Sequence, residues 1–259
     1  SRAMANLAEA AAAVVGADSL LTRVGAYYHD IGKSAQPEYF TENKAPDERS
    51  PHDDLAPEVS ADAIMAHVVV GAKMLREAGV PEPVVEFVYT HHGTQLVKFF
   101  WNKYQQREPV EDEAVLDESH FRYPGMKPMS RETAILMLVD SIEATSRTID
   151  KTNKAGFEEM IRHIVFDKLK AGQLDDSGLT LADLKVLTGR MAATLENMYH
   201  GRVKYPWQRD KEKADAAQPG DTPSDGSAAP ETDEAALPVD GASGSASPTG
   251  TTEAHSTRT

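Results

Sequence analysis

The sequence contains no cysteine. Disulfide bonds, thiolate-ligated zinc and a cysteine nucleophile are therefore excluded, and a reducing compartment such as the cytoplasm is the natural setting. The sequence also lacks a run of about 18 apolar residues and a basic segment followed by a long apolar one. We therefore expect neither a membrane span nor a secretory signal peptide within this chain.

Positive charge is scarce as well. The chain has 27 Lys and Arg against 41 Asp and Glu, a formal net charge of −14, and half of that excess lies in residues 210–259. No broad basic stripe occurs in the rest of the chain, which argues against a nucleic-acid duplex as the main partner. A small phosphorylated ligand needs only a few well-placed cations and is not excluded.

Helix-forming sequence makes up most of the chain. We expect an all-α domain over residues 1–206, and a disordered tail over residues 207–259 because that segment is acidic, low in complexity and lacks aromatic anchors after its first residue. Because the first helix begins without a cap, we interpret the chain as starting inside an element. The expected helices are residues 1–15, 18–28, 57–78, 81–93, 94–106, 130–144, 157–170 and 181–199, with a long loop at 34–57.

One stretch joins ligand chemistry to a helix end: residues 27–33, Tyr-Tyr-His-Asp-Ile-Gly-Lys. Neighbouring helical residues point about 100° apart, so His29 and Asp30 cannot fill one ligand position, but both can reach a cation beside the last turn. We interpret Gly32 as the stop of this helix and Lys33 as a cation for phosphate oxygens. Taken alone, such a pair is more often an ordinary solvated helix end.

Three further places strengthen the metal interpretation. His67 lies within the apolar surface of the third helix, where a hydrogen-bonded core histidine is the commoner case. His91 and His92 close the fourth helix, where they either complement the helix dipole or converge on one cation. Asp140 follows the apolar run 134–139, and burying its carboxylate costs several kcal/mol unless something compensates its charge.

These candidate ligands are all imidazoles and carboxylates, which favours iron or manganese over structural zinc. The number of candidate ligands exceeds what a single cation with open coordination positions needs. Two divalent transition metals that share one carboxylate are therefore the economical arrangement. Such a pair can bind a bridging hydroxide and polarise a phosphoryl oxygen. The candidate ligands are His29, Asp30, His67, His91, His92 and Asp140.

Two segments rich in aromatic side chains could form substrate walls. In the loop 34–57, Tyr39, Phe40 and Asn43 could stack on or hydrogen-bond to a base, although anchoring the loop is the commoner role. Residues 121–128, Phe-Arg-Tyr-Pro-Gly-Met-Lys-Pro, could bind a nucleotide by stacking and phosphate pairing. Packing of that segment over the core is about as common.

Residues 29–33, His-Asp-Ile-Gly-Lys, resemble the core motif of the HD superfamily of metal-dependent phosphohydrolases. Over roughly residues 1–206 the chain resembles the cytoplasmic catalytic domain of the PgpH-type (7TMR-HD) cyclic-di-AMP phosphodiesterases. The more specific matches are residues 5–11 (Ala-Asn-Leu-Ala-Glu-Ala-Ala), 24–33, 91–94 (His-His-Gly-Thr), 121–125 leading to 130–134, and 140–144 (Asp-Ser-Ile-Glu-Ala).

The resemblance implies an HD-domain helical bundle that holds a di-iron or di-manganese centre and hydrolyses cyclic di-AMP to linear pApA. A metal-bridging hydroxide would attack phosphorus in line with the departing 3′ oxygen, while the metals and Lys33 offset the developing charge, so Asp30 and Lys33 are the expected catalytic residues. One metal would be held by His67, His91 and His92, the other by His29 and Asp140, with Asp30 between them. Contacts to the phosphates or adenines are expected from Lys98, Arg122, Tyr123, Lys127 and Arg131.

Members of this family join the domain to a transmembrane bundle and an extracytoplasmic domain. The resemblance therefore implies a longer, membrane-anchored protein with this domain on the cytoplasmic face. The family pattern also has an earlier histidine, which would precede Ser1. We interpret its absence as truncation of the sequence and expect the chain as written to hold the His29/Asp140 metal more weakly.

Two other functions stay open. One is hydrolysis of another nucleotide or an alarmone on the same scaffold. It is disfavoured because no Glu-Asp follows the His-Asp pair, and because the Gly-Tyr-Pro of the cyclic-di-GMP branch does not follow residues 91–94. The other is a non-catalytic domain that binds the dinucleotide and signals.

Overall fold

The structure, a computed structural model, describes residues 2–43, 49–107, 116–149 and 153–200. The predicted disordered tail lies outside these residues, and the division of the chain at residue 206 stays a prediction. Within the described ranges the secondary structure is helical apart from one isolated β-bridge between Leu96 and Arg122. The predicted all-α class is confirmed.

Eight α-helices and five 3₁₀ turns follow one another in the described ranges. The helices are α1 Arg2–Val14, α2 Ser19–Tyr28, α3 Pro57–Glu77, α4 Glu82–Thr90, α5 Lys98–Gln106, α6 Arg131–Ser146, α7 Lys154–Lys170 and α8 Leu181–His200. The 3₁₀ turns are η1 Ile31–Ala35, η2 Pro37–Tyr39, η3 Thr41–Asn43, η4 Pro51–Asp53 and η5 Glu118–Phe121.

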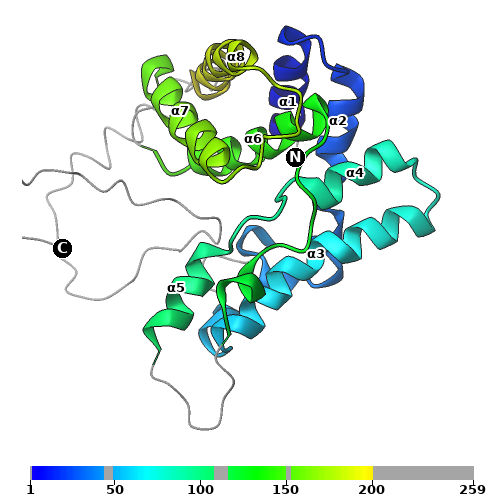
Figure 1. The fold of residues 1–259 in the computed structure, drawn as a ribbon, viewed down its shortest axis with the longest axis vertical. Helices are drawn as coiled ribbons and strands as arrows, with labels where there is room; N and C mark the ends of the chain where they lie inside the picture. The colour runs from blue at the N-terminus through cyan, green and yellow to red at the C-terminus, as the bar shows by residue number, and fades with distance from the viewer. Residues whose placement is uncertain (1, 44–48, 108–115, 150–152, 201–259) are drawn as a thin grey trace, which may run out of the picture.

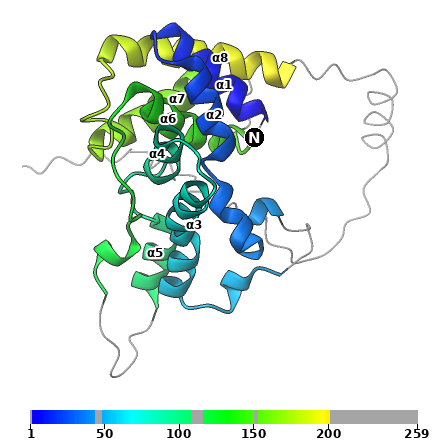
Figure 2. The same cartoon turned by 90° about the vertical axis from the view of Figure 1, so that its right-hand side faces the viewer.

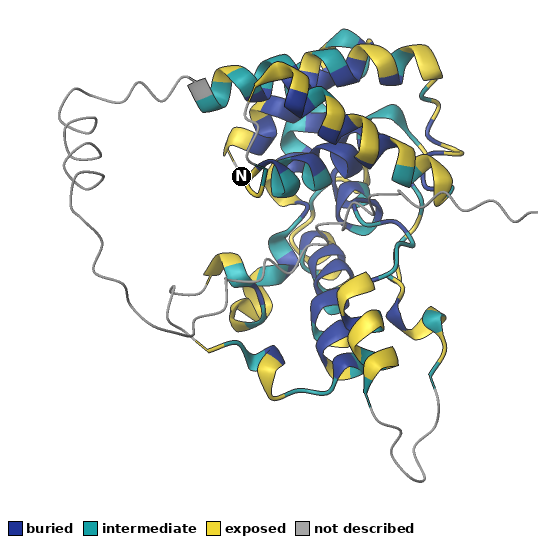
Figure 3. Ribbon diagram, turned by 90° about the vertical axis from the view of Figure 1, so that its left-hand side faces the viewer, coloured by how far each residue is buried: buried dark blue, intermediate teal, exposed yellow. Residues whose placement is uncertain are grey.

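Helices α1, α2, α6, α7 and α8 form one group, at the top of Figure 1. Its centre is α6, whose residues 134–139 are all buried, as the apolar run predicted. The side chain of Ser130 caps α6, and Thr133 returns a bond to the Ser130 backbone, so this helix begins where the sequence indicated. Figure 3 shows the buried sides of these helices facing one another.

The second group, below the first in Figures 1 and 2, contains α3, α5 and the turns around them. Helix α4 lies between the groups and contacts α2, α3 and α6. The junction therefore joins separate apolar cores, and the ends of α2 and α4 lie at it. The lower core consists of Phe40, Ala61, Ile64, Met65, Val97, Phe100 and Phe121.

Three local features differ from the sequence-based expectation. The described residues of the expected loop 34–57, namely 34–43 and 49–57, contain several 3₁₀ turns and are not an open loop. Helix α5 begins at Lys98 instead of residue 94, because the amide of Val97 donates to the Phe121 carbonyl at 2.8 Å and the preceding residues are held by that pairing. Helix α7 begins at Lys154, because the side chain of Asn153 accepts from the Gly156 amide and caps the helix earlier than expected.

Gly32 does not stop α2, which ends four residues earlier. It lies inside η1, and a Cβ atom added to it would lie 2.0 Å from the backbone oxygen of His67. A glycine at this position is what allows η1 to approach the backbone of α3. This close approach places Asp30 beside the imidazole of His67.

Candidate metal centre

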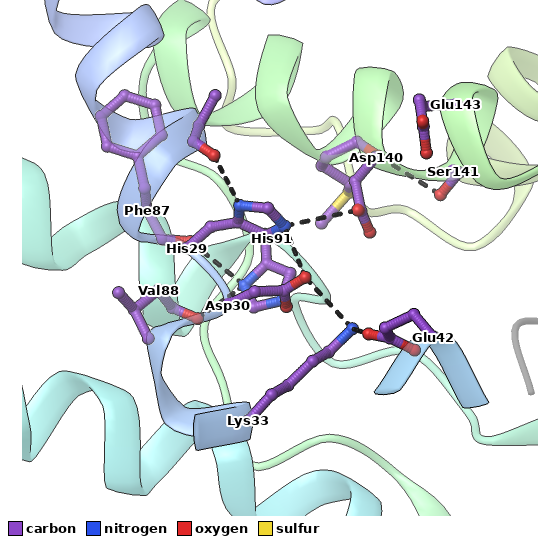
Figure 4. Close-up of polar contacts among 12 residues, drawn as sticks. His29, Asp30, Lys33, Glu42, Phe87, Val88, His91, Asp140, Ser141 and Glu143 are labelled. Atoms are coloured by element: carbon purple, nitrogen blue, oxygen red, sulfur yellow. Dashed lines mark hydrogen bonds and ion pairs between the residues drawn. The ribbon is translucent and has the colours of Figure 1, made fainter. Parts of the chain in front are cut away.

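Four helices bring the six predicted ligands together at the junction of the two groups, and Figure 4 shows four of them, His29, Asp30, His91 and Asp140. His29 is the C-cap of α2, with Asp30 directly after it, and Asp140 lies on the last turns of α6. The histidines of α3 and of the end of α4 approach from the other side. His29, His67 and His91 are buried.

Three of the imidazoles are oriented in the same way. Each Nδ1–H donates to the backbone carbonyl three residues earlier, at 3.1 Å for His29, 2.6 Å for His67 and 2.7 Å for His91. A bond of this kind fixes the ring orientation and directs Nε2 to the opposite side. The three Nε2 atoms consequently face the centre of the cluster.

The Nε2 atoms of His67 and His91 lie 3.2 Å apart, and an imidazole nitrogen of His92 lies within 4.8 Å of both. Burial, with a contribution from the charge on His91, lowers the pKa of His67 to about 3. Burial and the same neighbour hold the pKa of His92 well below its usual range. His67 and His92 thus resist protonation, which suits a divalent cation because such a cation prefers neutral imidazole.

Asp30 presents one carboxylate oxygen to each side of the cluster. Its Oδ1 lies 3.7 Å from His67 Nε2 and 3.6 Å from His91 Nε2, whereas its Oδ2 lies 3.0 Å from His29 Nε2. A carboxylate placed in this way can be shared by two cations. The bridging role that the resemblance implied for Asp30 stays a prediction.

The second half of the site is held by charge. His29 Nε2 lies 3.5 Å from Asp140 Oδ1 (Figure 4). Burial alone would lower the pKa of His29, but the charges of Asp30 and Asp140 outweigh it and raise this pKa to about 10. Burial also opposes ionisation of Asp140, and the close polar contact with His29 and the charge of that imidazole nevertheless keep the pKa of Asp140 below the usual value.

His29 Nε2 is buried, and among the described residues it forms no well-directed hydrogen bond. A cation bound by His29 and Asp140 would replace the proton on His29 Nε2 and give this nitrogen a partner. The donor set, all nitrogen and oxygen, therefore fits two divalent cations that share Asp30. The assignment of individual ligands stays a prediction.

Lys33 points into the same site. Its Nζ lies 3.1 Å from Asp30 Oδ2 and 2.8 Å from Glu42 Oε1 (Figure 4). Glu42 was not among the predicted site residues. The only indication in the sequence is its place in the loop 34–57, where Tyr39, Phe40 and Asn43 were considered as contacts to a base. Phe40 of that segment is 4% exposed, with its ring 5.7 Å from the His67 ring, so it anchors the segment to the core.

Of the predicted substrate contacts, the structure brings Tyr123 to the cluster. Its ring stacks on His92 at a centroid distance of 4.2 Å. Arg122 donates to the Thr94 carbonyl at 3.1 Å and pairs with Glu118.

The remaining predicted contacts lie elsewhere. Lys127 Nζ is 3.6 Å from Asp175, and Lys98 is exposed at the start of α5. Arg131 donates to the carbonyls of Val15 and Gly178 at 2.9 and 3.1 Å, a contact that ties three segments together. None of these contacts joins the three side chains to the cluster, and their role in substrate binding stays a prediction.

Gln173 is a supporting residue that the sequence did not reveal. It is buried, its Oε1 accepts from the Thr94 amide at 3.1 Å, and its Nε2 donates to the Thr94 hydroxyl at 3.0 Å. This pair of bonds holds the turn that follows His91 and His92. The contact joins residues 79 positions apart, so no local pattern indicates it.

The family model of the HD domain matches residues 1–145. The chain belongs to the HD-domain family. This HD domain is 42% identical over 210 residues to the cyclic-di-AMP phosphodiesterase PgpH of Bacillus subtilis, covering 81% of this chain and 29% of PgpH. The chain thus spans less than a third of that relative.

Solved structures agree with this assignment. The crystal structure of the PgpH HD domain of Listeria monocytogenes matches with a TM-score of 0.70 and 39% identity, over 77% of this chain and 91% of that one. The same domain in complex with cyclic-di-AMP matches with a TM-score of 0.70 and 39% identity, over 76% and 90%. The predicted family is confirmed.

No helix in the described part of this HD domain combines the length and apolar character needed to cross a bilayer.

Proposed function

We propose that this HD domain is a metal-dependent phosphodiesterase that hydrolyses cyclic di-AMP to pApA. The observation that carries the proposal is the position of Asp30, with one oxygen toward His67 and His91 and the other toward His29. The likeness to a domain solved with cyclic-di-AMP supports the choice of substrate. Adenine over guanine rests on that likeness.

The residues would hold two divalent cations, iron or manganese, and share Asp30 between them. His67, His91 and His92 fit one cation, and His29 with Asp140 fits the other. When bound, such cations supply an activated water at neutral pH and offset the negative charge of the phosphate.

The chain's own groups have separate tasks. The backbone bonds to the three Nδ1 atoms hold the imidazoles in one orientation, so the ligands need little rearrangement. Lys33 places a positive charge at the edge of the cluster, where it can stabilise charge that develops on a phosphoryl oxygen.

Turnover with matched variants tests this proposal. With added Mn²⁺ or Fe²⁺ we expect the protein to convert cyclic di-AMP to pApA, faster than cyclic di-GMP, and Asp30→Asn to lower kcat by at least about 1,000-fold, equal to about 4 kcal/mol. Asp62→Asn, which removes the same charge from an exposed position of α3, is the control and should leave the rate unchanged. Retained turnover in Asp30→Asn would refute the shared-carboxylate mechanism, and binding without cleavage by the unaltered protein would favour the signalling alternative.

We also propose that the domain works in the cytoplasm within a longer, membrane-anchored protein. The absence of cysteine and the resemblance to PgpH-type proteins support this proposal. Fractionation of cells that express the full-length protein, followed by protease treatment of right-side-out and inverted vesicles, tests it. Cleavage of the domain from the outer face of intact cells would contradict it.

A further inference from the structure

The inference concerns the ion pair between Lys33 and Glu42 at the edge of the metal cluster. The ammonium group of Lys33 contacts Asp30 at 3.1 Å and Glu42 at 2.8 Å, and Figure 4 shows the two carboxylates on different sides of it. The Asp30 side lies toward the cluster. Glu42 therefore lies on the side of the ammonium group that faces away from the metal ligands.

Exposure distinguishes the two carboxylates. The side chain of Glu42 is 43% exposed, that of Asp30 is 32% exposed and that of Lys33 is 17% exposed. Glu42 is therefore the more exposed of the two carboxylates that contact the ammonium group. A phosphate oxygen that approaches Lys33 from the side of Glu42 would compete with that carboxylate for the ammonium group.

Glu42 is positioned by the structure around it. Glu42 lies on η3, the turn that directly follows the buried Phe40. The ring of Phe40 packs on His67, and its centroid lies 5.2 Å from Lys33 Nζ. The next residue, Asn43, donates from its side chain to the Pro37 carbonyl at 3.3 Å. The segment thus places a carboxylate next to Lys33, the lysine at the cluster that we assign to the phosphate.

The contact of Lys33 with Asp30 uses Oδ2, the same oxygen that faces His29. If Asp30 is shared by cations, less of its negative charge remains for Lys33. Glu42 then becomes the main anionic partner of the ammonium group among those described here.

We propose that the carboxylate of Glu42 occupies the place on Lys33 that a substrate phosphate takes, and that Glu42 limits phosphate affinity by competing for the ammonium group. The inference rests on the proposed function for the identity of the ligand as a phosphate ester. Glu42 acts through Lys33 and is a positioning residue.

The test measures binding of adenosine 5′-monophosphate to the Mn²⁺-loaded protein by titration calorimetry. Removing a partly exposed competing charge in Glu42→Gln should lower Kd by about twofold to fivefold. Glu38→Gln removes the same charge from an exposed position of the same segment and should leave Kd unchanged. In a Lys33→Met background, Glu42→Gln should have no effect, because the contested group is gone.

The direction of the effect separates competition from structural support. If Glu42 only stabilised the fold, Glu42→Gln would weaken binding and lower Tm. Weaker or unchanged binding in Glu42→Gln, no binding by any form, or an effect that persists in Lys33→Met would each overturn the inference.

Cyclic di-AMP turnover measured on the same preparations separates this inference from the proposed function. Competition at Lys33 predicts a lower KM for cyclic di-AMP in Glu42→Gln. If Glu42→Gln lowers Kd for adenosine 5′-monophosphate and no form cleaves cyclic di-AMP, the proposed function fails and the inference stands. If cleavage occurs and KM and Kd do not fall in Glu42→Gln, the inference fails and the proposed function stands.

Discussion

His29 lies between two carboxylates, with Asp30 at 3.0 Å and Asp140 at 3.5 Å. In the metal-free protein a proton on this imidazole compensates both charges, which is why its pKa is raised to about 10 although burial opposes the charged form. The proton and a cation therefore compete for His29 Nε2. At the scale of the residue, the free energy of unfolding of the metal-free protein should depend on pH.

We expect metal-free protein to lose stability as the pH rises from about 6.5 to about 10. A group whose folded pKa lies above its unfolded value of 6.5 contributes fully below 6.5, and its contribution is lost as the pH rises through the folded pKa. The loss should be on the order of 3 kcal/mol, measured as the free energy of unfolding in urea after chelation.

His29→Gln is the matched variant for this measurement. It should be less stable at pH 6 and should show a flatter profile between pH 6.5 and 10. An alkaline loss that is equally steep in His29→Gln would show that another group causes it. Addition of Mn²⁺ at pH 9 should restore stability to the unaltered protein, because the cation takes the place of the proton.

At the scale of the element, the contact between η1 and α3 sets the distance between Asp30 and His67. We expect Gly32→Ala to destabilise the protein by about 1–3 kcal/mol, because the new methyl group would overlap the His67 carbonyl and force the two backbones apart. The same shift should weaken Mn²⁺ binding, measured by calorimetry.

Gly189→Ala is the control for this substitution. A Cβ atom at Gly189, inside α8, would meet no other atom within 4 Å. Because alanine favours helix over glycine, this variant should gain up to about 1 kcal/mol. If Gly32→Ala is as stable as Gly189→Ala, the close approach of η1 does not constrain the site.

The elements also show what a sequence can and cannot reveal. The starts of α2 and α6 were predictable, because Asp18 and Ser130 cap the first turns through contacts only three residues long. That the candidate ligands share a metal site was inferred from their residue types and from the resemblance, because no local pattern gives the distances between them. Glu42 and Gln173 were missed, since their partners lie nine and 79 residues away and are fixed only by packing.

At the scale of the whole molecule, the cluster connects helices that belong to different apolar cores. Helices α2 and α6 belong to the upper group, α3 carries His67 in the lower group, and α4 lies between them. Two cations that share Asp30 and are held by residues from these four helices would add cross-links between the cores. Metal binding should therefore stabilise the domain as a unit.

Metal removal tests this last step. A ligand that binds only the folded protein stabilises it by about 2.7 kcal/mol at 100 times its Kd, so Tm should rise with Mn²⁺ concentration and fall on chelation. His67→Gln should reduce the rise in Tm, whereas His163→Gln, an exposed position of α7, should leave it unchanged. If His67 holds the cation, removing this ligand must lower the affinity of the protein for Mn²⁺. A Tm that is independent of Mn²⁺, or a Tm that depends on Mn²⁺ equally in both variants, would therefore show that these imidazoles do not bind the cation.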